Sequence, residues 1–215
     1  MAEKHRHFVP AAGRDWLLPL YDPFARLFRM ESALRRLVEQ AGLAPGQRVL
    51  DLGCGTGALT LLTKRTQPGI EIVGLDPDAK ALARARRKAD GAGLTLRLEQ
   101  GFGDALPFPD ESFDRVLSSF MFHHLEAAQK PAVLREVHRV LRPGGVLHLL
   151  DFGGGHGLGA LLAHLVHREE SLRANTEHPL TSGMREAGFG QAEETERRSS
   201  LVGGLVYYSA TRSAA

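Results

Sequence analysis

A nine-residue stretch, VLDLGCGTG at residues 49–57, constrains the fold of this chain more than any other segment. Its first part is a run of apolar residues, typical of a strand that is covered on both faces of a sheet. Its second part contains Gly53, Gly55 and Gly57, which allow a tight turn and a close approach of a ligand to the backbone. Residues 58–64 then have helical apolar spacing. The stretch therefore predicts a strand, a ligand-binding turn and a helix whose first N–H groups face the ligand.

The glycine spacing alone leaves the class of ligand open. Gly53, Gly55 and Ala58 also satisfy the G-x-G-x-x-[GA] fingerprint of dinucleotide-binding folds. Asp51, however, ends the predicted strand two residues before the first glycine, where its carboxylate would repel a pyrophosphate. S-adenosylmethionine carries an ammonium group and a sulfonium and has no phosphate, so this cofactor is favoured over NAD. The alternative interpretation of Asp51 is a carboxylate that only binds amides of the loop.

A second predicted strand, EIVGLD at residues 71–76, also ends in a carboxylate. Asp76 lies about twenty residues after the glycine turn, where an acidic side chain can accept both hydroxyls of a ribose. Pro77 suits the first position of a helix that we expect to run to about residue 89. The alternative role of Asp76 is that of a helix cap.

A third predicted strand, residues 94–99, precedes the loop GFGDALPFPDESFD at residues 101–114. In this loop, Asp104 is a candidate acceptor for the adenine amino group, and Ala105 offers its backbone N–H to the ring. As an ordinary turn residue, Asp104 would need no ligand.

The rest of the chain continues this alternation of strands and helices. We expect a fourth strand within residues 112–120, an amphipathic helix over 128–141, a Pro-Gly-Gly turn at 143–145, a fifth strand over 146–151, and a closing hairpin formed by 192–198 and 205–212. Strands that alternate with helices form a parallel, doubly wound α/β sheet.

Four motifs follow one another in the sequence: VLDLGCGTG, GLDPDAKALARAR, GDALPFPDESFDRVLSSFMFHHL and EVHRVLRPGG. Through these motifs the chain resembles the class I S-adenosylmethionine-dependent methyltransferases over about residues 45–150. The chain is most similar to the subgroup with the UbiE-type ubiquinone/menaquinone C-methyltransferases and many small-molecule methyltransferases. This resemblance implies a Rossmann-like sheet of seven strands, mostly parallel with one antiparallel strand near the carboxyl terminus. It also implies these cofactor contacts: Asp51, Gly53, Gly55 and Gly57 at the methionine end, Asp76 and Pro77 near the ribose, Asp104 and Ala105 at the adenine, and Thr56 and Ser119 at matching positions.

The chain departs from that subgroup after the predicted fifth strand. The quinone enzymes carry a longer insertion with a Ser-Tyr pair, whereas this chain has EESLRANTEHPLTSGMREAGF at residues 169–189. The Asn/Asp-Pro-Pro-Tyr tetrapeptide of amino-group methylation on DNA bases is also missing from the sequence. We therefore expect a small organic acceptor and assign no particular quinone.

Two segments outside the predicted sheet are placed to receive the acceptor. Residues 1–40 are expected to form a tail and an apolar helical cap, and residues 41–215 are expected to form the methyltransferase domain. Together we expect them to form a single compact domain. Tyr21, at a break in the cap, is expected to touch the cofactor or the acceptor, with packing as the alternative. Residues 152–180 begin with FGGGHGLG, which favours a mobile entry loop. The apolar cap favours a hydrophobic or aromatic acceptor.

Methyl transfer from a sulfonium consumes the positive charge on sulfur, so alignment and exclusion of water supply most of the catalysis. An acceptor that must lose a proton also needs a general base. His124 is the first candidate for this base and His156 the second, because histidine titrates near neutral pH. Ligands of open α/β sheets bind beyond the carboxyl ends of strands, which places His123 and Asp151 near the methyl group as well. A structural role beside the following helix is the alternative for His124.

Composition excludes several other classes of protein. The chain has 215 residues and a formal net charge of +2, which fits one globular domain and argues against nucleic acid as a partner. Cys54, the single cysteine, excludes an internal disulfide, and the scattered histidines do not predict a metal site. The apolar run at 158–166 is too short to span a bilayer, so we expect a cytoplasmic protein without integral membrane association. A homodimer is compatible with the sequence. The alternative functions are an NAD-dependent oxidoreductase and a non-catalytic S-adenosylmethionine-binding regulator.

Overall fold

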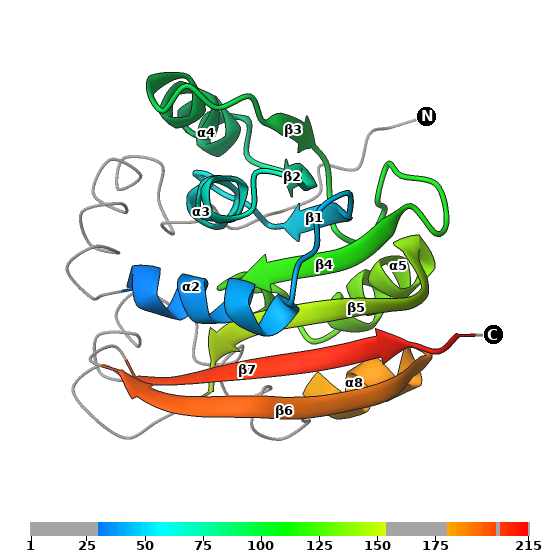
Figure 1. Ribbon diagram of the computed structural model, residues 1–215. Coiled ribbons are helices and arrows are strands. Elements are labelled where there is room, and N and C mark those ends of the chain that lie inside the picture. The colour runs from blue at the N-terminus through cyan, green and yellow to red at the C-terminus, as the bar shows by residue number, and fades with distance from the viewer. Residues whose placement is uncertain (1–29, 154–179, 201–202, 215) are drawn as a thin grey trace.

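The computed structural model describes residues 30–153, 180–200 and 203–214. These residues form one seven-stranded sheet with the strand order β3-β2-β1-β4-β5-β7-β6 (Figure 1). The strands are β1 (Arg48–Leu52), β2 (Glu71–Asp76), β3 (Arg97–Gln100), β4 (Phe113–Ser119), β5 (Leu141–Phe152), β6 (Phe189–Ser200) and β7 (Gly203–Arg212). The helices are α2 (Met30–Ala41), α3 (Ala58–Thr66), α4 (Ala79–Gly91), α5 (Lys130–Val140), α8 (Leu180–Glu186) and the short 3-10 helix η2 (Phe122–His124).

Strand pairing confirms the predicted doubly wound sheet. Strands β1 to β5 pair in parallel, and β7 runs antiparallel to both β5 and β6. Strand β1 lies between β2 and β4, so the order of the strands reverses at its carboxyl end. Ligands of open α/β sheets bind at such a switch point. The fold therefore places the glycine turn after β1 at the centre of the expected site.

Helices cover both faces of the sheet, as Figure 1 shows with α2 and α3 in front and α5 and α8 behind. Neighbouring residues of one strand point to opposite faces, so Val49 packs in the core with α2 and α3 while Leu50 packs in the core with α5 and α8. Each fully buried side chain of this size stabilises the fold by about 1.5–3 kcal/mol. Both faces of the central strands are thus covered, as their continuous apolar sequences predict.

Several predicted boundaries differ from the structure, among them those of α4, β3 and β5. Pro77 does not begin the helix: Asp78 is its N-cap, with Oδ1 accepting the N–H groups of Lys80 and Ala81 at 2.8 and 3.3 Å, and the helix begins at Ala79. An Asp side chain satisfies the orphan donors of a helix start, which Pro does not. Strand β3 begins at Arg97 and not at residue 94. Strand β5 begins at Leu141, since Leu141 pairs with Phe113 before a register shift that contains the Pro-Gly-Gly turn.

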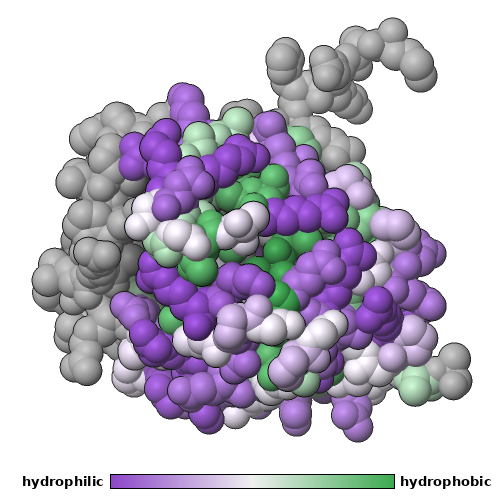
Figure 2. Space-filling model, turned by 45° about the horizontal axis from the view of Figure 1, so that its top comes forward, coloured by the Kyte–Doolittle hydropathy of each residue, from purple (hydrophilic) through white to green (hydrophobic). Residues whose placement is uncertain are grey.

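The two segments expected to receive the acceptor are only partly described. Helix α2 packs against the sheet through Leu34, Leu37 and Val38, at the spacing of one helical face. Tyr21, His156 and the glycine-rich entry loop lie outside the described residues. Among the described residues, no helix is long and apolar enough to cross a membrane. The face in Figure 2 is largely hydrophilic, with hydrophobic residues gathered near its centre.

Candidate functional site

The turn after β1 depends on its glycines for its backbone conformation. Gly53, Gly55 and Gly57 have φ angles of +73°, +51° and +79°, a region that residues with a Cβ adopt only with strain. A Cβ at Gly53 would also clash with the side chain of Met121, and one at Gly57 would lie 2.9 Å from Cβ of Ala85 in α4. The predicted turn is therefore present. Its glycines also let neighbouring parts of the protein pack closely, which the motif alone does not reveal.

Asp76 connects the end of β2 to this turn. Its Oδ2 accepts the backbone N–H of Gly55 at 2.8 Å, and its Oδ1 accepts the N–H of Asp78 at 2.9 Å. Burial raises the pKa of the carboxyl group, and these two hydrogen bonds oppose the rise. Each carboxylate oxygen has a second lone pair. Asp76 can therefore hold the turn and still accept hydrogen bonds from a ligand.

Asp51 is fully buried at the carboxyl side of β1. Its Oδ2 accepts the hydroxyl of Thr60 in α3, whereas its Oδ1 has no hydrogen-bond partner among the described residues. Burial raises its pKa to about 7, the charge of Asp76 adds to the rise, and the Thr60 hydroxyl opposes it. A buried carboxylate oxygen without a partner is costly. A ligand cation at this place would remove that cost, which is what the ammonium group of S-adenosylmethionine offers.

Other predicted contact residues lie in the turn itself and after or at the ends of the neighbouring strands β2 and β4. The hydroxyl and carbonyl oxygens of Thr56 accept hydrogen bonds from Lys88 Nζ at 2.9 and 3.0 Å, so this part of the turn is tied to α4. The carbonyl of Pro77 accepts a hydrogen bond from Gln100 at the end of β3. Ser119 is half-buried at the end of β4. The turn is thus held by α4 through Lys88 and by the end of β2 through Asp76.

The loop after β3 carries the two residues predicted to recognise adenine. Asp104 is partly buried, and Ala105 is exposed. The backbone N–H of Ala105 donates to the carbonyl of Phe102 at 3.3 Å, a long hydrogen bond. The next residue, Leu106, donates its N–H to Oε2 of Glu136 in α5 at 2.8 Å. The loop is therefore fixed on its helix side.

A buried histidine–aspartate pair lies at the ends of β4 and β5. Nδ1 of His123 lies 2.6 Å from Oδ1 of Asp151, and the backbone N–H of His123 donates to Oδ2 at 2.8 Å. Asp151 Oδ1 also accepts the N–H of Phe152. The carboxylate of Asp151 thus fixes η2 to the end of β5. The sequence placed both residues in this region but not as a pair; the available signal was an acidic residue ending a strand opposite the FHH segment.

His124, the residue predicted as a general base, lies beside this pair. Its ring centroid is 4.0 Å from that of His123, and it is half-buried where His123 is buried. Phe120, which leads into this segment, has a φ of +54°, a strained conformation for a bulky residue. Lys130, at the start of α5, has its pKa lowered by burial, an effect that the charge of Asp151 opposes. Titratable groups therefore gather at the ends of β4 and β5.

Comparisons with known proteins agree with this arrangement. A family model described as a methyltransferase domain matches residues 49–145. The chain is 42% identical over 139 residues to a demethylmenaquinone methyltransferase of Thermus thermophilus, covering 63% of this chain and 62% of that protein. It is 39% identical over 122 residues to the ubiquinone/menaquinone biosynthesis C-methyltransferase UbiE of Xanthomonas campestris, covering 55% of this chain and 47% of that protein. The chain thus spans about half to three fifths of the length of these relatives.

Solved structures show the same fold at lower identity. The YcgJ protein of Bacillus subtilis superposes with a TM-score of 0.69 at 19% identity, covering 86% of this chain and 99% of that one. The phosphoethanolamine N-methyltransferase 2 of Haemonchus contortus, solved with S-adenosyl-L-methionine, gives a TM-score of 0.70 at 16% identity, covering 85% of this chain and 52% of that one.

Proposed function

We propose that the chain is an S-adenosylmethionine-dependent methyltransferase that acts on a small hydrophobic or aromatic acceptor, as its match to a methyltransferase domain and its methyltransferase relatives support. One observation carries this proposal. Asp51 is buried beside the glycine turn with one oxygen that has no partner among the described residues. A cofactor with an ammonium group satisfies this oxygen, whereas a dinucleotide would bring phosphate charge toward it.

The cofactor contacts follow the ends of the strands. Asp51 is proposed to hold the ammonium group, the remaining lone pairs of Asp76 the ribose hydroxyls, and Asp104 with Ala105 the adenine. The other proposed contacts are with Gly53, Gly55, Thr56, Gly57, Pro77 and Ser119, and with Tyr21 outside the described residues. Bound S-adenosylmethionine supplies an electrophilic methyl group on a cationic sulfur. The protein's own contribution is to align that group with the acceptor and to exclude water.

The acceptor is proposed to lie over the ends of β4 and β5. His123, His124 and Phe152 place three rings there, with centroid distances of 4.0 Å between the histidines and 5.1 Å from His123 to Phe152. Rings of this kind suit a flat apolar acceptor. The names of the demethylmenaquinone and UbiE relatives support an aromatic substrate of the same general class. We retain His124 as the proposed base for acceptors that must lose a proton, with His156 outside the described residues.

The same proposal covers partners and location. A net charge of +2 supports a small-molecule partner over nucleic acid, and we propose a cytoplasmic enzyme that can form a homodimer. An NAD-dependent oxidoreductase and a non-catalytic regulator are the competing functions.

Transfer of labelled methyl groups tests the proposal. The full chain is incubated with S-adenosylmethionine labelled in the methyl group and with a panel of phenols, hydroquinones, polar amines and nucleic acid. We expect label in the organic extract of the aromatic acceptors and, at a low concentration of S-adenosylmethionine, much less label with Asp51→Asn. Stabilisation by NAD and not by S-adenosylhomocysteine would favour the oxidoreductase. Tight binding of S-adenosylhomocysteine without incorporation into the panel or into cell-extract fractions would favour the regulator.

A further inference from the structure

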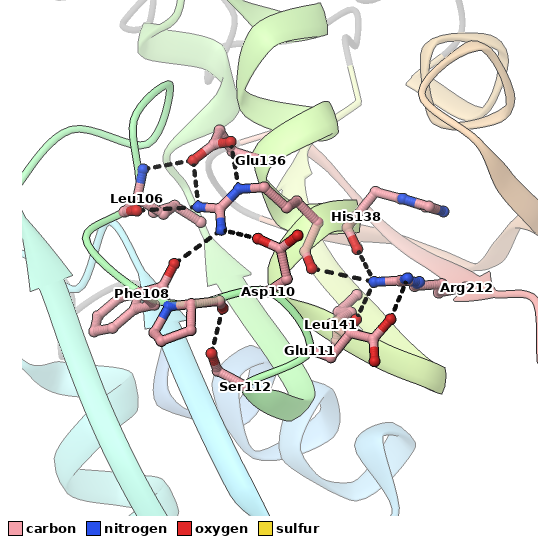
Figure 3. Close-up of polar contacts among 11 residues, drawn as sticks. Leu106, Phe108, Asp110, Glu111, Ser112, Glu136, His138, Leu141 and Arg212 are labelled. Atoms are coloured by element: carbon pink, nitrogen blue, oxygen red, sulfur yellow. Dashed lines mark hydrogen bonds and ion pairs between the residues drawn. The ribbon is translucent and has the colours of Figure 1, made fainter.

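Arg139 of α5 holds the loop that follows the predicted adenine contacts. Its guanidinium donates to the carbonyls of Leu106 at 3.1 Å and Phe108 at 2.9 Å and to the carboxylate of Asp110 at 2.7 Å. It also binds both oxygens of Glu136, each at 2.8 Å. Figure 3 shows Glu136 and the carbonyls of Leu106 and Phe108 directed toward the same guanidinium. One arginine thus binds three residues of a single loop.

Glu136 completes this arrangement, because its Oε2 also accepts the N–H of Leu106 at 2.8 Å. Both backbone polar groups of Leu106 are therefore bound by one ion pair. The loop sequence Leu106-Pro-Phe-Pro-Asp110 has two prolines without an N–H, so regular backbone pairing cannot hold it. The ion pair lowers the pKa of Glu136 and raises that of Arg139, so both groups stay charged at neutral pH.

We propose that Arg139 and Glu136 are positioning residues for recognition of the adenine base, an inference that rests on the proposed function. Ala105 shares its following peptide group with Leu106, whose N–H is fixed by Glu136. Only the two backbone dihedrals of Ala105 separate this fixed group from the N–H that is proposed to meet the adenine ring. Fixing Leu106 therefore restricts the directions that this N–H can take and the positions open to Asp104.

The predicted consequence is base selectivity. A carboxylate at Asp104 accepts a hydrogen bond from the 6-amino group of adenine, whereas the 6-carbonyl of hypoxanthine offers no donor there. A site built to bind a polar group rejects an analogue that lacks it, provided that the site is held in place. Loosening the loop should therefore reduce selectivity for adenine more than it reduces binding of the rest of the cofactor.

Arg212 supplies a matched control. Its guanidinium donates to the carbonyls of His138, Arg139 and Leu141 and pairs with Glu111 at 2.7 Å (Figure 3). It therefore anchors the carboxyl end of the same helix and the far end of the same loop, six residues away from Ala105 in the sequence. Arg212→Lys should loosen α5 without releasing Leu106.

The experiment is calorimetric titration of the wild-type full chain and of the variants Arg139→Lys, Glu136→Gln and Arg212→Lys. The ligands are S-adenosylhomocysteine and its hypoxanthine analogue, S-inosylhomocysteine. We expect the wild type to prefer the adenine ligand by roughly tenfold or more. In Arg139→Lys and Glu136→Gln this ratio should approach one, mainly through weaker binding of the adenine ligand, whereas Arg212→Lys should keep the ratio.

Several results would overturn the inference. The first is that folded Arg139→Lys and Glu136→Gln keep the wild-type ratio of affinities for the two ligands. The second is that Arg212→Lys loses this ratio to the same extent as they do. The third is that the wild type itself does not distinguish the two ligands. If Arg139→Lys does not fold, Glu136→Gln decides, since it removes the charge and one of the two oxygens that pair with Arg139 but keeps the size of the side chain. Failure of the proposed function is a separate result, in which the wild type binds neither ligand.

Discussion

The carboxylate of Asp76 accepts the backbone N–H of Gly55 at 2.8 Å, so the end of β2 holds the middle of the glycine turn after β1. The second oxygen of Asp76 binds the N–H of Asp78 at the start of α4. One side chain thus joins the turn proposed to bind the methionine end of the cofactor to the strand end proposed to bind the ribose. Substitutions of Asp76 should consequently weaken binding of both the methionine end and the ribose of the cofactor.

We expect Asp76→Ala to weaken binding of S-adenosylhomocysteine by about tenfold to a hundredfold, because hydrogen bonds to charged groups contribute about 1.5–3 kcal/mol. Asp76→Asn should lie between this variant and the wild type, since its amide keeps one acceptor oxygen but cannot accept both backbone N–H groups. Calorimetric titration measures both. Wild-type affinity in a folded Asp76→Ala protein would exclude the ribose role.

Asp51→Asn should stabilise the protein without its cofactor. Burial raises the pKa of Asp51 to about 7 from a value of 3.8, so between these pH values the folded state holds a proton that the unfolded state releases. Stability contributed by this group is therefore present below pH 4 and lost as the pH rises through 7. The full loss is about 4 kcal/mol. Asp51→Asn has no such loss, so its free energy of unfolding should exceed that of the wild type by more at pH 8 than at pH 5.

Denaturant unfolding at pH 5 and pH 8 checks this prediction. Thr60→Val is a useful comparison, because it removes the hydroxyl bound to Asp51 Oδ2 but leaves the carboxyl group in place. A gain in Asp51→Asn that is the same at both pH values would show that Asp51 is ionised throughout this range.

His148 should make the protein sensitive to acid. This buried residue of β5 has its pKa lowered to about 4 by burial, and its Nδ1 has no partner among the described residues. Because the unfolded state binds a proton below about pH 6.5 and the folded state does not, the associated stability is lost as the pH falls from 6.5 to 4. The loss is about 3 kcal/mol.

His148→Leu should remove this part of the pH dependence, as unfolding titrations from pH 7 to pH 4 can show. Asp51 acts in the opposite direction within the same window, so the test is best made in an Asp51→Asn background. If the difference in stability between Asp51→Asn and the double variant Asp51→Asn, His148→Leu does not change with pH, His148 does not titrate as described.

His124→Ala should slow methylation of acceptors that must lose a proton, by about a hundredfold or more, and have little effect on acceptors that are already neutral nucleophiles. His123→Ala is the comparison, since it removes the contact between the His123 ring and Asp151 at the base of η2 and should slow both kinds of acceptor. Initial rates with a phenol and a thioether or tertiary amine measure the difference. Equal losses for both acceptor types in His124→Ala would assign it a structural role.

Local pattern predicted most of the fold. The apolar runs of β1 and β2, the glycine turn and the helix after it are properties of neighbouring residues, and the structure confirms them. Side-chain partners between distant elements could not be predicted in this way. His123 and Asp151 are 28 residues apart, and Arg139 lies in a motif that the sequence identified only as helix and turn. The predicted start of α4 at Pro77 was wrong because the side chain of Asp78 caps the helix, so the helix begins one residue after Asp78.

The central claim is that the buried carboxylate of Asp51 meets the ammonium group of the cofactor. The most direct measurement is a double cycle of affinities in which wild type and Asp51→Asn are each titrated with S-adenosylhomocysteine and with an analogue that lacks its amino group. We expect the wild type to lose about tenfold to a hundredfold in affinity when the amino group is removed, and Asp51→Asn to lose little. The same affinity ratio in both proteins would contradict the claim.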